Sequence, residues 1–139
     1  MRTILRNLAI AAAALLAAPT LPAADGETGA RIEFQELKHN FGNVDEDGGP
    51  VSCEFTFTNT GDAPLLIVNA TASCGCTRPE FPKKPVAAGK TGKIKVTYLP
   101  KGRPGEFSKT VTVRTNAKKN KKVTLKIQGW VNPSPSRKN

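Results

Sequence analysis

Apolar and polar residues alternate along most of the chain after residue 30, with the period of two that is typical of strands with one buried face. The clearest case is segment 51–58, where the apolar positions are Val51, Cys53, Phe55 and Phe57. Three later segments repeat the pattern, with inward positions Ile94, Val96 and Tyr98; Phe107, Val111 and Val113; and Val123, Leu125 and Ile127. We therefore expect at least four strands around one core.

Shorter segments complete the predicted set of strands. Residues 31–37 alternate and form a first strand, which bends and continues through residues 39–44, while residues 64–71 form an apolar strand. Turns rich in Gly, Asp, Asn or Lys separate the strands, and no helical period of 3.6 follows residue 24. About seven short strands at this spacing predict an all-β protein, an immunoglobulin-like β-sandwich over residues 31–131, with a disordered tail over residues 132–139.

The first 24 residues have the features of a signal peptide. Arg2 and Arg6 precede the apolar run 8–18, which is too short to cross a bilayer, and small residues follow near position 24. No later segment approaches the roughly 20 apolar residues of a membrane-spanning helix. The sequence therefore predicts an exported protein, located in the periplasm or outside the cell, that does not span a membrane.

Charge is distributed unevenly along the chain. The formal net charge is +10, but residues 25–77 carry −7 and residues 78–139 carry +15. One interpretation is a set of lysine-rich strand faces exposed to solvent. The other is a polyanionic partner, such as an anionic glycan, an anionic membrane surface or an acidic protein. Nucleic acid is not expected, because an exported protein rarely meets it.

The three cysteines form the most distinctive motif, since Cys74 and Cys76 are separated only by Gly75, and Cys53 lies on a predicted strand. In an oxidising compartment they allow one internal disulfide and one leftover thiol, with three possible pairings. A Cys74–Cys76 bond closes a very small ring, whereas a bond from Cys53 to either partner would staple a longer loop. Cys53 also fits a buried thiol that acts as a small apolar residue.

Two further roles for this loop follow from thiol chemistry. Two thiolates at this spacing suit a soft ion such as Cu(I). A site of thiol–disulfide exchange is the other alternative, in which Lys109 approaches the loop and lowers a thiol pKa. The chain has no Cys-x-x-Cys motif, which argues against exchange. We find no Ser/His/Asp set and no catalytic pair of carboxylates, so we expect no enzyme activity and no cofactor.

The order of the predicted strands places several of these residues at one end of the sandwich. The expected neighbours are Cys53, Cys74, Cys76, Lys101, Arg103, Lys109 and Trp130. Lys101, Arg103, Lys109 and Trp130 are the candidate binding residues. Trp130 has the opposite parity from Leu125 and Ile127, so it should face away from the core, either as a plain exposed aromatic or as a contact for a partner protein or a sugar.

Five stretches carry a resemblance to a known family: residues 39–42 (HNFG), 55–61 (FTFTNTG), 72–77 (ASCGCT), 92–98 (GKIKVTY) and 105–113 (GEFSKTVTV). They resemble the bacterial domain-of-unknown-function family 1573, over about residues 31–131. That family is similar to immunoglobulin-like modules of the major-sperm-protein type, most of which bind or assemble other proteins. The resemblance implies a binding or assembly module for another envelope or extracellular protein. Cys53 lies outside the shared motif.

Overall fold

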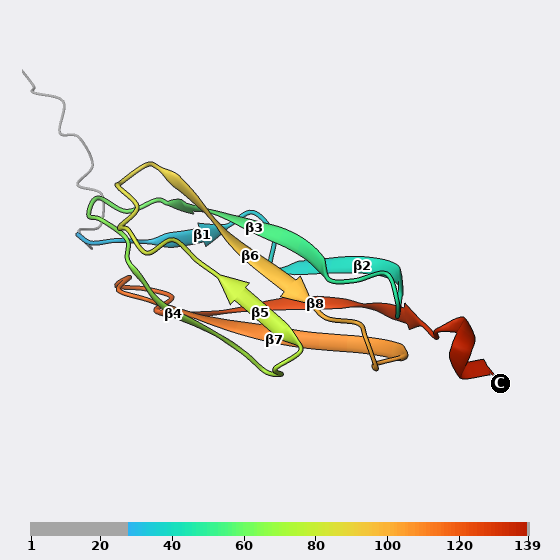
Figure 1. The fold of residues 1–139 in the computed structure, drawn as a ribbon. Coiled ribbons are helices and arrows are strands. Elements are labelled where there is room, and N and C mark those ends of the chain that lie inside the picture. Colours follow the sequence, from blue (N-terminus) through green and yellow to red (C-terminus); the bar gives the residue numbers. More distant parts are fainter. Residues whose placement is uncertain (1–27, 139) are drawn as a thin grey trace, which may run out of the picture.

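The computed structural model describes residues 28–138, which form eight strands and one short 3-10 helix (Figure 1). The elements are β1 (Ile32–Phe34), β2 (Lys38–Asp45), β3 (Val51–Asn59), β4 (Ile67–Ala72), β5 (Thr77–Glu80), β6 (Thr91–Tyr98), β7 (Gly105–Thr115), β8 (Lys122–Asn132) and η1 (Pro135–Lys138). The predicted signal peptide over residues 1–24 lies outside the described residues. Within them, no helix is long and apolar enough to cross a membrane.

The strands form two four-stranded sheets, ordered β1-β3-β6-β5 and β2-β8-β7-β4. All pairs are antiparallel except β2 and β8, which are parallel. The predicted first strand is divided, since β1 pairs with β3 in one sheet and β2 pairs with β8 in the other. The all-β, immunoglobulin-like sandwich expected from the sequence is therefore confirmed, with eight strands because the first is split and β5 adds a short edge strand beside β6.

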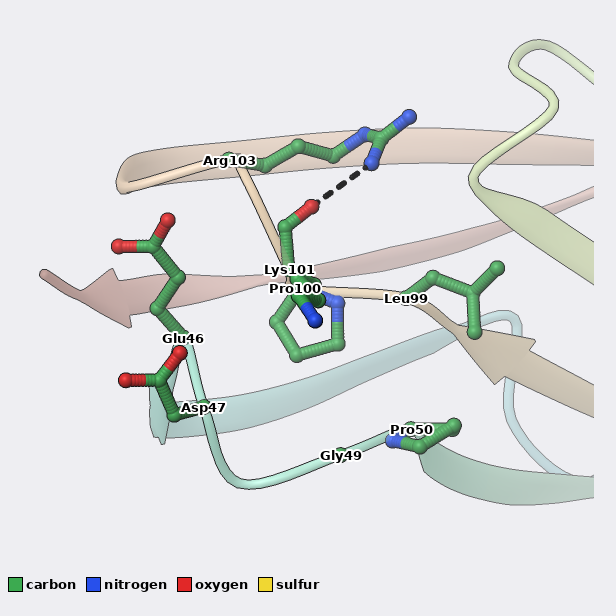
Figure 2. A pocket seen from close by; sticks show the side chains of 8 residues that line it. All are labelled: Glu46, Asp47, Gly49, Pro50, Leu99, Pro100, Lys101 and Arg103. Carbon is green, nitrogen blue, oxygen red and sulfur yellow. Dashed lines mark hydrogen bonds between the residues drawn. The ribbon is translucent and has the colours of Figure 1, made fainter. Parts of the chain in front are cut away.

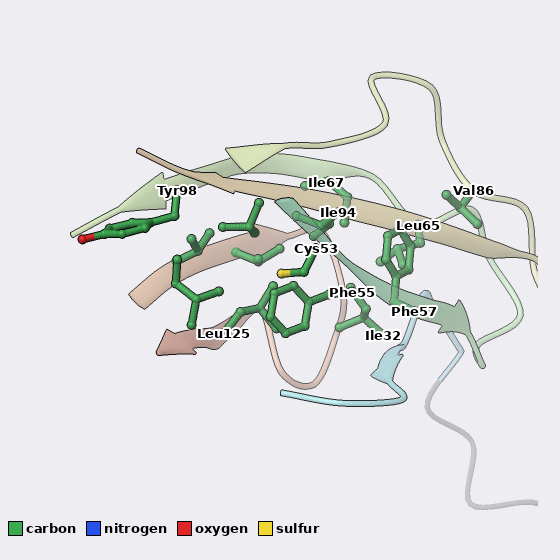
Figure 3. Close-up of a cluster of buried hydrophobic side chains, with 14 of the residues drawn as sticks. Ile32, Cys53, Phe55, Phe57, Leu65, Ile67, Val86, Ile94, Tyr98 and Leu125 are labelled. Atoms are coloured by element: carbon green, nitrogen blue, oxygen red, sulfur yellow. The ribbon is translucent and has the colours of Figure 1, made fainter. Parts of the chain in front are cut away.

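The core lies between the sheets and consists of the alternate residues that the sequence pattern predicts (Figure 3). Phe57, Ile94, Val113 and Leu125 are fully buried. The rings of Tyr98 and Phe107 stack from opposite sheets with centroids 3.9 Å apart. Because each large apolar side chain contributes roughly 1.5 to 3 kcal/mol on burial, this core fixes the relative position of the loops at the two ends.

We call the two ends of the sandwich the near pole and the far pole. The near pole contains the β2–β3 turn (residues 46–50), the β6–β7 loop (residues 99–104) and the C-terminal segment; the far pole contains the β7–β8 hairpin turn (residues 116–121) (Figure 1). Residues 132–138, for which the sequence predicts disorder, instead end β8 and form η1. Ser134 is buried there, because it is bonded to the β2–β3 turn.

Candidate functional site

A pocket of about 630 Å³ opens at the near pole, between the β2–β3 turn and the β6–β7 loop (Figure 2). Pro50 and Leu99 supply its apolar surface, and the buried Pro100 lies behind them. Lys101 and Arg103, two of the predicted binding residues, line the same pocket. The remaining lining residues are Glu46, Asp47 and Gly49. The pocket thus combines a rigid apolar surface with cationic and anionic side chains.

The β6–β7 loop holds Arg103 by local hydrogen bonds. The Arg103 N–H donates to the Pro100 carbonyl at 3.0 Å and closes a turn, in which Gly102 has a φ of +76°. Glycine suits this position because side chains rarely adopt a positive φ. The Arg103 Nη1 also donates to the Lys101 carbonyl at 3.0 Å (Figure 2). These bonds fix the direction of the Arg103 side chain before any ligand arrives.

Glu46 connects this loop to the C-terminal segment. Its carboxylate is buried and accepts hydrogen bonds from Gly102 N (3.1 Å), Ser134 N (2.8 Å) and Arg137 Nη2 (2.7 Å). The Ser134 N–H and then the Arg137 guanidinium hold the pKa of Glu46 below its ordinary value. The carboxylate is therefore ionised at neutral pH and fully engaged by these donors.

Sequence reasoning missed Glu46, because the acidic turn 45–50 has the composition of a solvated loop. Its partners Ser134 and Arg137 lie 88 and 91 residues away in the sequence, so no pattern in the local sequence predicts the contact. Asp47 takes part as well, since its carboxylate accepts the Ser134 hydroxyl. Asp45, the last residue of β2, accepts a hydrogen bond from Asn132 Nδ2 in the same region, so acidic and basic side chains both gather at this end of the molecule.

The cysteine loop lies beside this pocket and forms the smallest of the three possible disulfides. Cys74 and Cys76 are bonded, with Cα atoms 5.2 Å apart. The Ser73 N–H donates to the Thr110 carbonyl at 2.9 Å, which anchors the loop on β7. The Leu99 N–H donates to the Cys76 carbonyl at 2.9 Å, which ties the loop to a residue of the pocket. The disulfide thus braces the segment between β4 and β5.

Cys53 is separate from this loop. Its thiol is free and buried in the core (Figure 3). In the register between β3 and β6, Cys53 lies opposite Val96. Burial raises its pKa to about 11, so it stays protonated at neutral pH. The structure thus contains no staple from Cys53, and its position agrees with a small apolar core residue.

The metal and exchange interpretations of the loop gain no support. Both loop thiols are joined to each other, and Cys76 is fully buried. Among residues 28–138, no three His, Cys, Asp or Glu side chains come together in a group that could hold a metal ion. Lys109, the residue expected to lower a thiol pKa, is half-buried on β7. It lies next to Thr110, whose carbonyl accepts the Ser73 N–H of the cysteine loop.

Trp130 lies on β8 and faces outward, as its parity predicts, with 49% of its surface exposed. It pairs with Asn43 of β2 and Glu106 of β7. Lys101 and Arg103 meet in the near-pole pocket, and Cys74 and Cys76 lie next to it. Trp130 does not line this pocket and lies instead on the outer face of the β2-β8-β7-β4 sheet.

Comparison with solved structures shows the same fold in three proteins of low sequence identity. A protein of unknown function from Porphyromonas gingivalis has a TM-score of 0.65 and 13% identity, over 80% of this chain and 51% of that one. The human CEP192 ASH/PapD-like domain 7 has a TM-score of 0.61 and 12% identity, over 74% of this chain and 86% of that one. The VesB protease of Vibrio cholerae has a TM-score of 0.57 and 18% identity, over 73% and 31%.

These likenesses concern the fold alone. This chain spans about half of the Porphyromonas gingivalis protein and about a third of the protease. No curated protein matches the chain by sequence. The sequence profile of one family, described as a protein of unknown function (DUF1573), does match, over residues 32–131, and the chain therefore belongs to the DUF1573 family.

Proposed function

We propose that this domain is a non-enzymatic binding module, exported from the cytoplasm, that holds a partner protein at its near pole. The observation that carries the proposal is the pocket in which Lys101 and Arg103 lie beside the apolar surface of Pro50 and Leu99. The matching chemical group is a carboxylate next to an apolar side chain, as at an acidic residue or a chain end of another envelope or extracellular protein.

The physical properties of the pocket support binding of such a group. Its volume of about 630 Å³ falls within the usual range for ligand sites, roughly 300 to 1,000 Å³. Arginine forms strong, paired hydrogen bonds with carboxylates, and lysine adds a point charge. Two prolines and the hydrogen bond from Arg103 to Lys101 reduce the freedom that would be lost on binding. Exposed cations also make the interaction sensitive to salt.

The chemistry of the described residues favours binding over catalysis. Glu46, the buried carboxylate of the pocket, accepts three hydrogen bonds and has a lowered pKa, so it is a poor general base. The Cys53 thiol has a raised pKa and is a poor nucleophile. A predicted signal peptide and a disulfide are both typical of exported proteins, which supports that part of the proposal.

Site-specific crosslinking tests the proposal. A photo-crosslinking amino acid replaces Leu99 in the full chain, and products formed in the native envelope are identified by mass spectrometry. We expect one main partner, and we expect Lys101→Ala/Arg103→Ala to lose that product. The matched control is Lys121→Ala/Lys122→Ala, which removes the same charge at the far pole and should keep it. Equal yields from both variants, with unchanged thermal stability, would contradict the proposal.

A further inference from the structure

A second pocket, of about 290 Å³, lies on the outer face of the β2-β8-β7-β4 sheet. Its lining residues are Asn40, Gly42, Asn43, Glu106, Gln128, Gly129 and Trp130. None of them lines the near-pole pocket. The new pocket therefore offers a separate surface, with an exposed indole, three side-chain amides and one carboxylate.

Strand alternation and register bring these groups together. Trp130 and Gln128 are two residues apart on β8 and point to the same face of the sheet. Glu106 of β7 pairs with Trp130 on one side, and Asn43 of β2 pairs with it on the other. Asn40 pairs with Gln128 in the same way. The indole is thus flanked by polar side chains from two neighbouring strands.

A β-bulge in β2 makes this arrangement possible. The pairs Asn40–Gln128 and Asn43–Trp130 are three residues apart on β2 but only two apart on β8, so β2 contains one extra residue. The bulge includes Gly42, whose φ is +68° and whose N–H donates to Asn40 Oδ1 at 2.8 Å. Without the extra residue, Asn40 and Asn43 would point to opposite faces, because side chains alternate along a strand.

Gly129 allows the close approach of the bulge. A Cβ atom at this position would lie 2.8 Å from the Gly42 carbonyl oxygen and 2.8 Å from the Phe107 ring. Only glycine therefore lets β2 lie against β8 here. The close packing of the two glycines thus fixes the backbone on which the side chains of the pocket are placed.

We propose that this pocket binds a neutral pyranose ring of a glycan. The C–H groups on one face of a pyranose carry partial positive charge, and they stack on the negative face of an indole. No aromatic ring or cation of residues 28–138 stacks on Trp130, and about half of its surface is exposed. Side-chain amides and a carboxylate match sugar hydroxyls, since hydroxyls both donate and accept hydrogen bonds.

Charge and size restrict the ligand class. Glu106 is the only charged residue that lines the pocket, so an anionic sugar would meet a like charge, although the chain as a whole is strongly basic. The anionic glycan expected from the overall charge therefore does not suit this pocket. Its volume of about 290 Å³ is just below the usual range of ligand sites, roughly 300 to 1,000 Å³, which fits one sugar ring rather than a folded partner.

Trp130 is the only tryptophan in the chain, so its fluorescence reports on this pocket alone. The experiment titrates the purified protein with cellohexaose, maltohexaose and chitohexaose, and with sorbitol as an acyclic control. We expect a saturable change in emission with at least one hexasaccharide, at a dissociation constant of about 1 mM or tighter, and none with sorbitol. The absence of a change with all three hexasaccharides up to about ten times that concentration would overturn the proposal.

Substitutions identify the groups that contact the sugar, with binding measured by calorimetry. Trp130→Ala should abolish binding, while Trp130→Phe keeps a weaker affinity. Leu37→Ala is the matched control, because Leu37 has the same exposed fraction of 49% but does not line the pocket, and it should bind as the original chain does. Binding that survives Trp130→Ala would refute the assignment, as would its loss in Leu37→Ala when both variants remain folded.

Glu106→Gln tests the choice of a neutral ligand. This change removes the charge but keeps a group that can bond hydroxyls, so binding of the neutral hexasaccharide should persist. Heparin should leave Trp130 emission unchanged in the original chain at physiological salt. A stronger response to heparin than to every neutral sugar would show that the ligand is an anionic glycan and that the proposal is wrong. Because this pocket shares no residue with the near-pole pocket, the crosslinking result does not affect the outcome.

Discussion

Two buried polar side chains, Asn59 at the far pole and Glu46 at the near pole, hold the loops of the sandwich in different ways. Asn59 Oδ1 accepts hydrogen bonds from the N–H groups of Arg31 (3.3 Å) and Gly61 (3.0 Å). Its Nδ2 donates to the carbonyls of Ala63 (2.8 Å) and Val86 (2.9 Å). Every partner is neutral backbone, so the far-pole network does not depend on pH or salt.

Glu46 instead uses a charge. Two of its partners are backbone N–H groups, and the third is the guanidinium of Arg137, whose side chain is 55% exposed. The near-pole network is therefore sensitive to protonation and accessible to solvent. The far pole is thus held by bonds that do not depend on pH or salt. The near pole, which contains the proposed binding pocket, is held by the Glu46 network, which low pH or high salt weakens.

The largest effect should follow Asn59→Ala. The substitution removes all four side-chain hydrogen bonds of a fully buried residue, although the Val86 carbonyl still accepts the Leu65 N–H. We expect a loss of about 2 to 4 kcal/mol in the free energy of unfolding. Urea denaturation at pH 7 measures it. Asn59→Asp should be at least as harmful, because a carboxylate would face two carbonyl oxygens. A loss below about 1 kcal/mol would break the comparison, since the far pole would then not depend on this side chain.

A smaller loss of stability, but a clear local change, should follow Glu46→Ala. The substitution removes the acceptor of Ser134 N and Arg137, so the C-terminal segment should separate from the β2–β3 turn. We expect trypsin to cut after Arg137 faster than in the original chain, at unchanged far-ultraviolet circular dichroism. In Asn59→Ala, cleavage at this site should rise only in proportion to global unfolding. Equal protection of Arg137 with and without Glu46 would show that the network does not hold the tail.

The pH dependence of stability separates the two networks further. The pKa of Glu46 is lowered on folding, so its contribution is complete above its ordinary value of 4.5 and is lost as pH falls through the lower, folded value. As the pH falls below 4.5, the original chain and Asn59→Ala should therefore lose more stability than Glu46→Gln, whose side chain does not ionise. Thermal unfolding at several pH values tests this, and identical slopes for all three would contradict it.

The smallest effect should come from Arg137→Ala. Glu46 keeps its bonds to Gly102 N and Ser134 N, and the lost ion pair is half-exposed. We expect a loss within about 1 kcal/mol that shrinks at high salt. Unfolding at low and high ionic strength measures it. A loss as large as that of Asn59→Ala, or one independent of salt, would mean that the two poles do not differ in the way described.

The strands and the core could be predicted because they depend on local alternation. The inward residues of β3, β6, β7 and β8 and the outward direction of Trp130 follow from a period of two. The same alternation, with the strand order, accounts for Cys76 beside Leu99 at the near pole. These features need only the sequence of one strand at a time and the direction in which it runs.

The candidate sites depend on contacts that have no local pattern. The bonds from Glu46 to Ser134 and Arg137 join residues 88 and 91 positions apart, and the bulge at Gly42 requires the register between β2 and β8. The choice among three disulfides depends on distances across the sandwich, so spacing alone left it open. The sequence predicts disorder for segment 132–138 because the segment is polar, and its composition does not indicate that Ser134 and Arg137 bind Glu46.

The parallel pairing of β2 with β8 has a mechanical consequence. The described part of the chain begins before β1 at the far pole and ends with η1 at the near pole, so tension between its two ends runs along the strands (Figure 1). The ladder between β2 and β8 would then be pulled in shear, and its hydrogen bonds would have to break together rather than one after another. Separating β2 from β8 along this direction should therefore need more force than opening the same ladder one bond at a time.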